Sequence, residues 1–518
     1  MKSRSRTSSA MTLLMILFLV LSQRLAAQER PSSPPASLDV VREYRKNHEA
    51  EILRELVEFL AIPNVASDSA NIRKNAERLI EMMKRRDIRA RLLEGDGPPS
   101  VFGELITPGA VRTIGLYAHY DGQPVDASKW ATPPWQPALR SAAIDAGGEL
   151  ITIPRAGEKV EPEWRLYARS ASDDKAPIIA MLAALDALKA FGIKPVVNLK
   201  FFFEGEEEAG SRHLEKLLLR HKDLLSADVW ICADGPVHQS RRAAVFFGCR
   251  GIVSANITVY GPLKPLHSGH YGNWAPNPAM MLARLLASMK ADNGRVLIDG
   301  FYDGAEPLGE EEKQAIAESA SYDRTLMKEL GIVTPEGGGR SLAELINEPS
   351  LNIDGLRSEY VGGEARTIIP AEATAAVDLR LVKGIDPDRQ LERLIAHIKK
   401  QGYFVTTDEP TREMRLKHAR IARVTSSEGY RAARTPMNLP IAKKIVSAVE
   451  RAMGERPVLM PTLGGSGPLS IFDSVTGIPQ IGVPIVNHDN NQHATNENLR
   501  LQNLWDGIQV FAALMTMK

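Results

Sequence analysis

The chain has 518 residues, of which 44% are hydrophobic and 25% are charged, and its net charge is +1. This length is sufficient for two to three domains with a large core. The near-neutral charge gives no basis for binding nucleic acid or a strongly acidic partner, so neither is expected.

The N-terminus has the pattern of an export signal. An apolar run over residues 11–21 follows three basic residues and precedes small residues. We predict a signal peptide over residues 1–27, a linker over residues 28–38, and export to a periplasm or to the outside. The run is too short to cross a bilayer of about 30 Å as a straight helix, so no stable membrane span is expected. An uncleaved N-terminal anchor is the alternative.

Residues 39–247 alternate between helix and strand patterns, and residues 433–518 return to the same style. The patterns predict helices over 40–61, 71–89, 178–191 and 441–453, buried strands over 114–118 and 196–203, and a further apolar strand within 229–235 that ends before Asp234. We therefore expect an α/β catalytic domain in two parts, with a central mixed sheet flanked by helices.

Residues 248–432 have a different order of elements. Strands are predicted over 251–259, 350–360, 372–381 and 403–407, and helices over 277–290 and 386–401. This βαββαβ order is that of a ferredoxin-like α+β domain, here inserted as a lid. Another α/β layer is the alternative. Residues 300–348 form an acidic, irregular insert to which the sequence assigns no role.

His119 and Asp121 follow the apolar run 114–118 in LYAHYDGQPVD. Side chains alternate along a strand with period two, so His119 and Asp121 leave the sheet edge on the same side. An imidazole with a nearby carboxylate to orient it is a common metal-ligand arrangement. Taken alone, the pair is more often a turn or a satisfied polar pair.

Further ligand-type residues follow, most of them at the ends of apolar runs. They are Asp173 and Asp174 before a helix, Glu204, Glu206, Glu207 and Glu208 after three phenylalanines, Asp234 after VWICA, and His488 and His493 in a polar loop. For a lone Asp before a helix, an N-cap is the favoured interpretation. Because binding crevices of α/β sheets lie at the carboxyl ends of strands, a shared site explains the whole set better. Mixed His and carboxylate ligands suit two zinc ions about 3.5–4 Å apart, with Mn²⁺ or Co²⁺ possible.

Cys232 and Cys249 are the two cysteines of the chain. An exported protein could pair them, but buried thiols are the favoured interpretation.

The chain resembles the co-catalytic dizinc peptidases and deacylases. This family includes carnosinase-type dipeptidases, glutamate carboxypeptidase, aminoacylase and succinyl-diaminopimelate desuccinylase, and the resemblance is closest to the first of these. The runs that carry it are HYDGQPVD (119–126), WRLYARSASDDK (164–175), EGEEEAGS (204–211), HSGHYG (267–272), RTIIP (366–370) and HATNEN (493–498).

The resemblance implies a role for each matching residue. One metal would be held by His119, Asp173 and Asp234, and the other by Asp173, Glu208 and His493. Asp121 would orient His119, and Glu207 would be the general base for a metal-bridging water.

The resemblance also implies a homodimer formed through the lid. His267 would stabilise the oxyanion in the partner subunit's site. Arg380 would bind the substrate carboxylate, with Thr367 and Ser466 as weaker candidates for substrate hydrogen bonds. His270 has no such support.

The sequence departs from the family where glycines usually surround the bridging Asp. Ala168, Ser170 and Ala176 stand there, and any of them that needs a positive φ would be strained.

We expect a secreted zinc-dependent hydrolase that cleaves dipeptides or releases C-terminal amino acids. An N-acyl amino acid deacylase would use the same metal chemistry. A metal-free binding protein on this scaffold is the alternative from another class, but it would not need Glu207.

Overall fold

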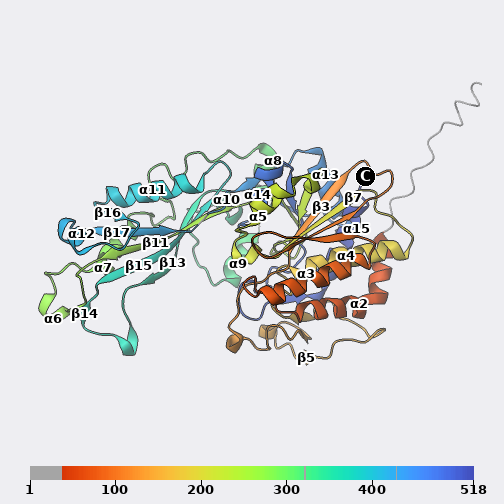
Figure 1. Ribbon diagram of the computed structural model, residues 1–518, viewed down its shortest axis with the longest axis horizontal. Helices are drawn as coiled ribbons and strands as arrows, with labels where there is room; N and C mark the ends of the chain where they lie inside the picture. The colour runs from red at the N-terminus through yellow and green to blue at the C-terminus, as the bar shows by residue number, and fades with distance from the viewer. Residues whose placement is uncertain (1–37, 320–321, 428) are drawn as a thin grey trace, which may run out of the picture.

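The computed structural model describes residues 38–319, 322–427 and 429–518, which form two lobes (Figure 1). The predicted signal peptide and most of the predicted linker lie outside these residues, so export stays a prediction. Among the described helices, none combines the length and the apolar character needed to cross a membrane.

The first lobe is built on an eight-stranded mixed sheet. Its strands, in sheet order, are β1 (Arg89–Leu93), β2 (Ser100–Leu105), β7 (Asn198–Glu204), β3 (Thr113–His119), β8 (Val229–Cys232), β20 (Gln480–Gly482), β9 (Ala244–Phe246) and β19 (Val458–Met460). The strands β7, β3, β8 and β20 run parallel to one another. Their carboxyl ends therefore meet at one edge of the sheet. The predicted mixed sheet is confirmed.

Helices cover both faces of this sheet. One face packs on α2 (Leu38–Leu60), α3 (Ser69–Lys84), α4 (Lys175–Ala190), α13 (Pro440–Met453) and α15 (Leu501–Met515), and the other on α5 (Leu214–Arg220) and α14 (Leu469–Thr476). The alternation along β3 matches this arrangement, since Leu116 packs in the first core and Tyr117 in the second. The predicted helix over 71–89 is too long, because the chain turns at Asp87, whose φ is +61°.

A small antiparallel sheet joins distant parts of the chain beside the main one. Its order is β21 (Asn498–Arg500), β6 (Arg165–Tyr167), β4 (Ala138–Arg140) and β5 (Leu150–Ile151). Asn498 pairs with Tyr167 in this sheet. The pairing places the loop that precedes β21 against the loop that follows β6.

The second lobe contains a five-stranded sheet in the order β13 (Ser350–Arg357), β15 (Glu372–Leu381), β11 (Gly251–Tyr260), β17 (Ile421–Ser426) and β16 (Phe404–Thr406). Helices α7 (Pro278–Ala287) and α11 (Pro387–Lys400) pack against it. The ferredoxin-like order is present, and the predicted strand over 403–407 is observed as β16, but it is not the strand that pairs with β11. The position beside β11 belongs to β17, which pairs with β11 through Ile257, whereas β16 adds to its outer edge.

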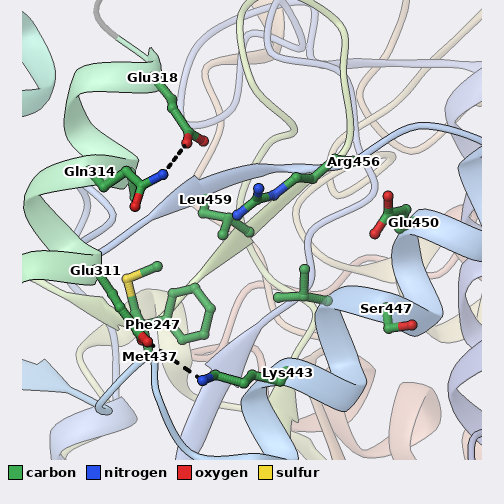
Figure 2. Close-up of a pocket in the computed structure, with 12 residues that line it drawn as sticks. Phe247, Glu311, Gln314, Glu318, Met437, Lys443, Ser447, Glu450, Arg456 and Leu459 are labelled. Carbon is green, nitrogen blue, oxygen red and sulfur yellow. Dashed lines mark hydrogen bonds and ion pairs between the residues drawn. The ribbon is translucent and has the colours of Figure 1, made fainter.

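The insert over residues 300–348 is not irregular as predicted. It contains α8 (Glu310–Ser319), α9 (Asp323–Glu329) and α10 (Leu342–Ile346). Its buried Ala315, on α8, belongs to the core of the first lobe, whereas Phe301 at the start of the insert belongs to the core of the second, so the insert contacts both lobes. A cavity of about 440 Å³ lies between α8 and α13, and its lining includes Phe247 and Lys443. Figure 2 shows these lining residues. None of the predicted site residues lines this cavity.

The chain passes between the lobes along two adjacent segments. β10 (Gly248–Cys249) pairs antiparallel with β18 (Ala433–Arg434). The boundaries predicted after residues 247 and 432 fall at these two strands. The division into domains itself remains a prediction.

Candidate metal centre

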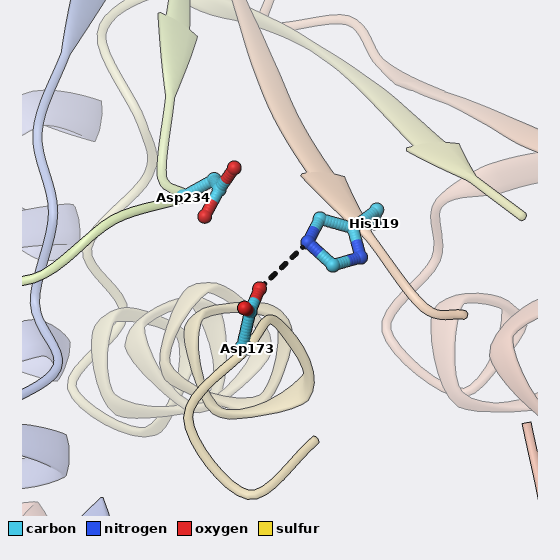
Figure 3. Close-up of side chains that lie close together, drawn as sticks. All are labelled: His119, Asp173 and Asp234. Carbon is cyan, nitrogen blue, oxygen red and sulfur yellow. Dashed lines mark hydrogen bonds and ion pairs between the residues drawn. The ribbon is translucent and has the colours of Figure 1, made fainter. Parts of the chain in front are cut away.

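The predicted ligands lie at the carboxyl edge of the parallel strands. His119 is the last residue of β3, and Asp234 follows β8, its neighbour in the sheet. Asp173 precedes α4, which covers one face of that sheet. Figure 3 shows the three side chains converging on one another.

These three residues form the first group of potential metal ligands. One ligand atom from each of His119, Asp173 and Asp234 lies within 4.8 Å of the other two. The Nε2 atom of His119 is 2.9 Å from Oδ1 of Asp173. Burial, reinforced by the charge of Asp173, raises the pKa of Asp234 to about 6.

The second group shares Asp173 with the first and adds Glu208 and His493. The Nε2 atom of His493 is 3.2 Å from Oδ2 of Asp173 and 3.1 Å from Oε2 of Glu208. These two contacts raise the pKa of His493 to about 11. Asp173 therefore faces both groups with different oxygens, which is the geometry required of a bridging carboxylate.

Asp121 supports both the imidazole and the acidic turn. Its side chain is fully buried, and its Oδ1 is 3.4 Å from Nδ1 of His119. The backbone N–H groups of Glu207 and Glu208 donate to its two oxygens at 3.1 and 3.0 Å. Asp121 thus orients His119 and also holds the short 3₁₀ turn over Glu207–Ala209.

Glu207 lies beside the two groups without belonging to either. Its Oε2 is 4.0 Å from Nε2 of His119. Burial, together with the charges of Asp234 and Glu208, raises its pKa, although His119 opposes this. A carboxylate with a raised pKa next to a metal site is suited to accept a proton.

The residues present fit a pair of divalent cations. Five carboxylates and two imidazoles are gathered at this edge: Asp121, Asp173, Glu207, Glu208, Asp234, His119 and His493. Such a buried concentration of negative charge is unfavourable without cations. The Oε1 atom of Glu208 is also buried without a hydrogen-bond partner among the described residues, and therefore remains available as a ligand.

Glu497 is a site residue that the sequence analysis missed. It is fully buried, and its Oε1 accepts hydrogen bonds from the backbone N–H groups of Ser172 and Asp173, both at 2.9 Å. Its Oε2 accepts from Ser170 N at 2.9 Å and from Nη1 of Arg169 at 2.8 Å. Glu497 therefore fixes the backbone of the loop that presents Asp173. The only sequence signal was its place in HATNEN.

Ser170 is the position at which the departure from glycine matters. Its φ is +61°, a conformation that favours glycine. Its Oγ accepts a hydrogen bond from Asn64 at 2.8 Å, and its N–H donates to Glu497. These bonds offset the expected strain.

The other acidic residues and the two cysteines discussed in the sequence analysis do not belong to the two ligand groups. Glu206 pairs with Nδ1 of His213 at 2.9 Å. Asp174 is the N-cap residue of α4, but its side chain makes no capping bond. Cys232 and Cys249 are both buried and free, so the favoured interpretation of buried thiols is confirmed.

The predicted substrate residues fall into two places. Nη1 of Arg380, on β15, donates to Oγ of Ser466 at 2.9 Å. A Cβ on Gly467, the next residue, would lie 3.8 Å from Oε1 of Glu207, so this loop adjoins the metal centre. Arg380 and Ser466 are therefore brought together beside the site.

His267 and Thr367 are not brought to the metal ligands of their own chain. His267 ends β12 (Leu266–His267) and is exposed, and the N–H of Ser268 donates to the carbonyl of Thr367 at 2.9 Å. The neighbouring α6 (Ser268–Tyr271) and β14 (Ile368–Ile369) lie at the far end of the second lobe (Figure 1).

A mixed α/β sheet that carries two ligand groups with a shared carboxylate, and a free carboxylate beside them, has the features of a two-metal hydrolase. A profile of peptidase family M20/M25/M40 matches residues 115–517. The chain therefore belongs to this family and is a metallopeptidase, so the predicted resemblance is confirmed.

Relatives and solved structures agree with this assignment. The chain is 27% identical to the Cys-Gly metallodipeptidase of Schizosaccharomyces pombe, over 92% of this chain and 97% of the relative. It is 26% identical to the human beta-Ala-His dipeptidase, over 97% of each chain. An M20 family metallo-carboxypeptidase from Sulfolobus solfataricus superposes with a TM-score of 0.74 at 28% identity, over 90% of this chain and 99% of that one.

Proposed function

We propose that this metallopeptidase hydrolyses dipeptides with two divalent cations in each subunit, zinc being the metal that the ligands suit best. The observation that carries the proposal is the position of Asp173, which faces both ligand groups while Glu207 stands free beside them. The dipeptidase names of the two relatives support the substrate class.

The side chains of this centre would have separate roles in binding the cations, transferring a proton and positioning other residues. His119, Asp173 and Asp234 would hold one cation, and Asp173, Glu208 and His493 the other. Bound cations would acidify a water held between them. Glu207 would accept the proton of the attacking water at Oε2 and return it to the leaving amine. Asp121 fixes the positions of Glu207 and Glu208 through their backbone N–H groups, and it orients the ring of His119.

The substrate would be held from two sides. The guanidinium of Arg380, with Ser466, would bind its carboxylate. His267 and Thr367, which lie far from the metal ligands of their own chain, would act in the site of a second copy. The homodimer formed through the lid is part of this proposal.

The role of Glu207 is tested by Glu207→Gln, which keeps the shape of the side chain but removes its ability to take up a proton. We expect kcat for a dipeptide to fall by about 10²–10⁴ while metal content stays at two per subunit. Metal content is measured by mass spectrometry on the purified protein. Glu206→Gln is the matched control, because the neighbouring Glu206 pairs with His213 and should leave kcat unchanged.

Full activity in Glu207→Gln would overturn the assignment of the base. The same kinetic assay distinguishes a dipeptidase from a deacylase when the wild-type protein is given dipeptides and N-acyl amino acids that have the same C-terminal residue. Hydrolysis of the N-acyl compounds alone would replace the dipeptidase proposal with a deacylase.

A further inference from the structure

Arg380 is held by a buried carboxylate two residues before it on β15. Its Nε donates to Oδ2 of Asp378 at 2.8 Å, and its Nη1 donates to Ser466. Nη2 has no hydrogen-bond partner among the described residues. Asp378 is 6% exposed, whereas the Arg380 side chain is 29% exposed, so the anchor is buried and the free nitrogen can reach a ligand.

A second buried guanidinium lies next to this pair. Nη2 of Arg250 donates to the carbonyl of Glu348 at 2.6 Å and to Ser350 at 2.8 Å. Burial and the charge of Arg380 lower the pKa of Arg250 to about 10, which leaves it charged at neutral pH. The backbone N–H of Arg250 also bonds to the carbonyls of Leu463 and Gly465, in the loop that contains Ser466.

The charges in this buried cluster do not cancel. Arg250 and Arg380 contribute two positive charges and Asp378 one negative charge, so the cluster has a surplus of one positive charge. Asp354 also interacts with Asp378 and Arg380, but it is exposed and screened by water. A surplus of one positive charge matches a single carboxylate, and a second carboxylate in the same buried place would remain unpaired.

We propose that Asp378 is a positioning residue that holds Arg380 and, with Arg250, restricts this subsite to substrates with one carboxylate. The preferred substrates are then dipeptides whose C-terminal residue is neutral or basic, and those ending in Asp or Glu are disfavoured. This inference rests on the proposed dipeptidase function and extends it.

Wild-type protein gives the first test, in which Ala-Ala, Ala-Lys and Ala-Asp are compared as substrates. We expect kcat/KM for Ala-Asp to be on the order of tenfold or more below the values for the other two. Equal values for all three would overturn the inference while leaving the dipeptidase proposal intact. If the wild type hydrolyses none of them, the proposed function itself fails.

Two substitutions of Asp378 then distinguish the effect of its charge from its effect on the position of Arg380. Asp378→Asn still accepts the Nε hydrogen bond but raises the surplus to two positive charges, so the ratio of kcat/KM for Ala-Asp over Ala-Ala should rise about tenfold. Asp378→Ala removes the anchor, so KM for Ala-Ala should rise about tenfold with kcat within about twofold of wild type. Asp354→Asn is the matched control and should move neither value.

Metal content and the thermal midpoint are measured for each variant, so that misfolded protein is recognised. An unchanged substrate ratio in folded Asp378→Asn would overturn the role of the charge. A fall in kcat with no rise in KM in folded Asp378→Ala would overturn the role in positioning Arg380.

Discussion

Several buried residues at this centre act by holding others. Asp121 receives two backbone N–H groups from the turn that carries the proposed base, and Glu497 receives three from the loop that carries the shared carboxylate. Partners of this kind fix the orientation of metal ligands, and their loss typically costs 10–100-fold in metal affinity or activity.

Glu497→Gln tests this role directly. One carboxylate oxygen would become an NH₂ group facing backbone donors, so the loop around Asp173 should shift. We expect metal affinity to fall by about 10–100-fold, measured by competition with a fluorescent chelator. Glu163→Gln is the control, because that carboxylate is an exposed partner of Arg500 near the same small sheet. Wild-type affinity in Glu497→Gln would show that Asp173 is positioned without it.

The sequence predicted the ligands and one supporting residue, Asp121, but it did not predict Glu497. The ends of the apolar runs predicted a shared site, and the family resemblance selected its ligands, which are His119, Asp173, Glu208, Asp234 and His493. The backbone partners of Glu497 lie more than 300 residues away, at separations of 324 to 327. Nothing local in HATNEN indicates that β21 pairs with β6, so its role depends on tertiary structure.

At the scale of elements, the pairing of β10 with β18 joins the two lobes. Gly248 is paired with Arg434 across the two strands, and a Cβ at Gly248 would be 2.0 Å from the carbonyl oxygen of Ala433. That contact is with backbone and cannot be relieved by a rotamer change. The glycine is therefore required by the crossing.

Gly248→Ala should destabilise the protein by about 1–3 kcal/mol, because the strands must separate to admit the methyl group. It should also lower kcat/KM, since Arg380 and Ser466 are contributed by the two lobes and meet near this crossing. Thermal unfolding and steady-state kinetics measure both effects. Gly355→Ala is the control, because nothing lies within 4 Å of a Cβ at that position of β13. Equal stability of the two variants would contradict the role assigned to the crossing.

The elements that the sequence predicted least well are those with weak patterns. The segment of α8 reads EEEKQAIAES, and only Glu312, Ala315 and Ile316 are buried, so its helical period is hidden by charge. The strand β17 was missed because β16, earlier in the chain, completed the expected order. Only pairing with β11 distinguishes the two strands.

At the scale of the whole molecule, the arrangement of the lobes leaves the proposed site incomplete within one chain. β12, which ends at His267, belongs to the end of the second lobe that is remote from the metal centre (Figure 1). A symmetric dimer would place the same patch of each lid in reach of the other subunit.

Mixing two inactive variants, His267→Ala and Glu207→Gln, tests this arrangement. About half of the dimers would be mixed and each would have one complete site, so activity should recover to roughly a quarter of wild type after free exchange of subunits. His270→Ala is the control for the first variant, because its ring lies 4.5 Å from that of His267 and it has no proposed role. If subunits exchange and no activity returns, His267 does not act across the dimer.

The strand order of the main sheet also governs when the protein can finish folding. β20 lies between β8 and β9, yet a ribosome makes it after the whole second lobe. Until that last segment emerges, the hydrogen-bonding edges of β8 and β9 stay open, and the apolar face that α15 covers is exposed. His493 arrives in the same segment. A nascent or prematurely terminated chain that lacks this segment therefore has neither a closed main sheet nor a complete second ligand group.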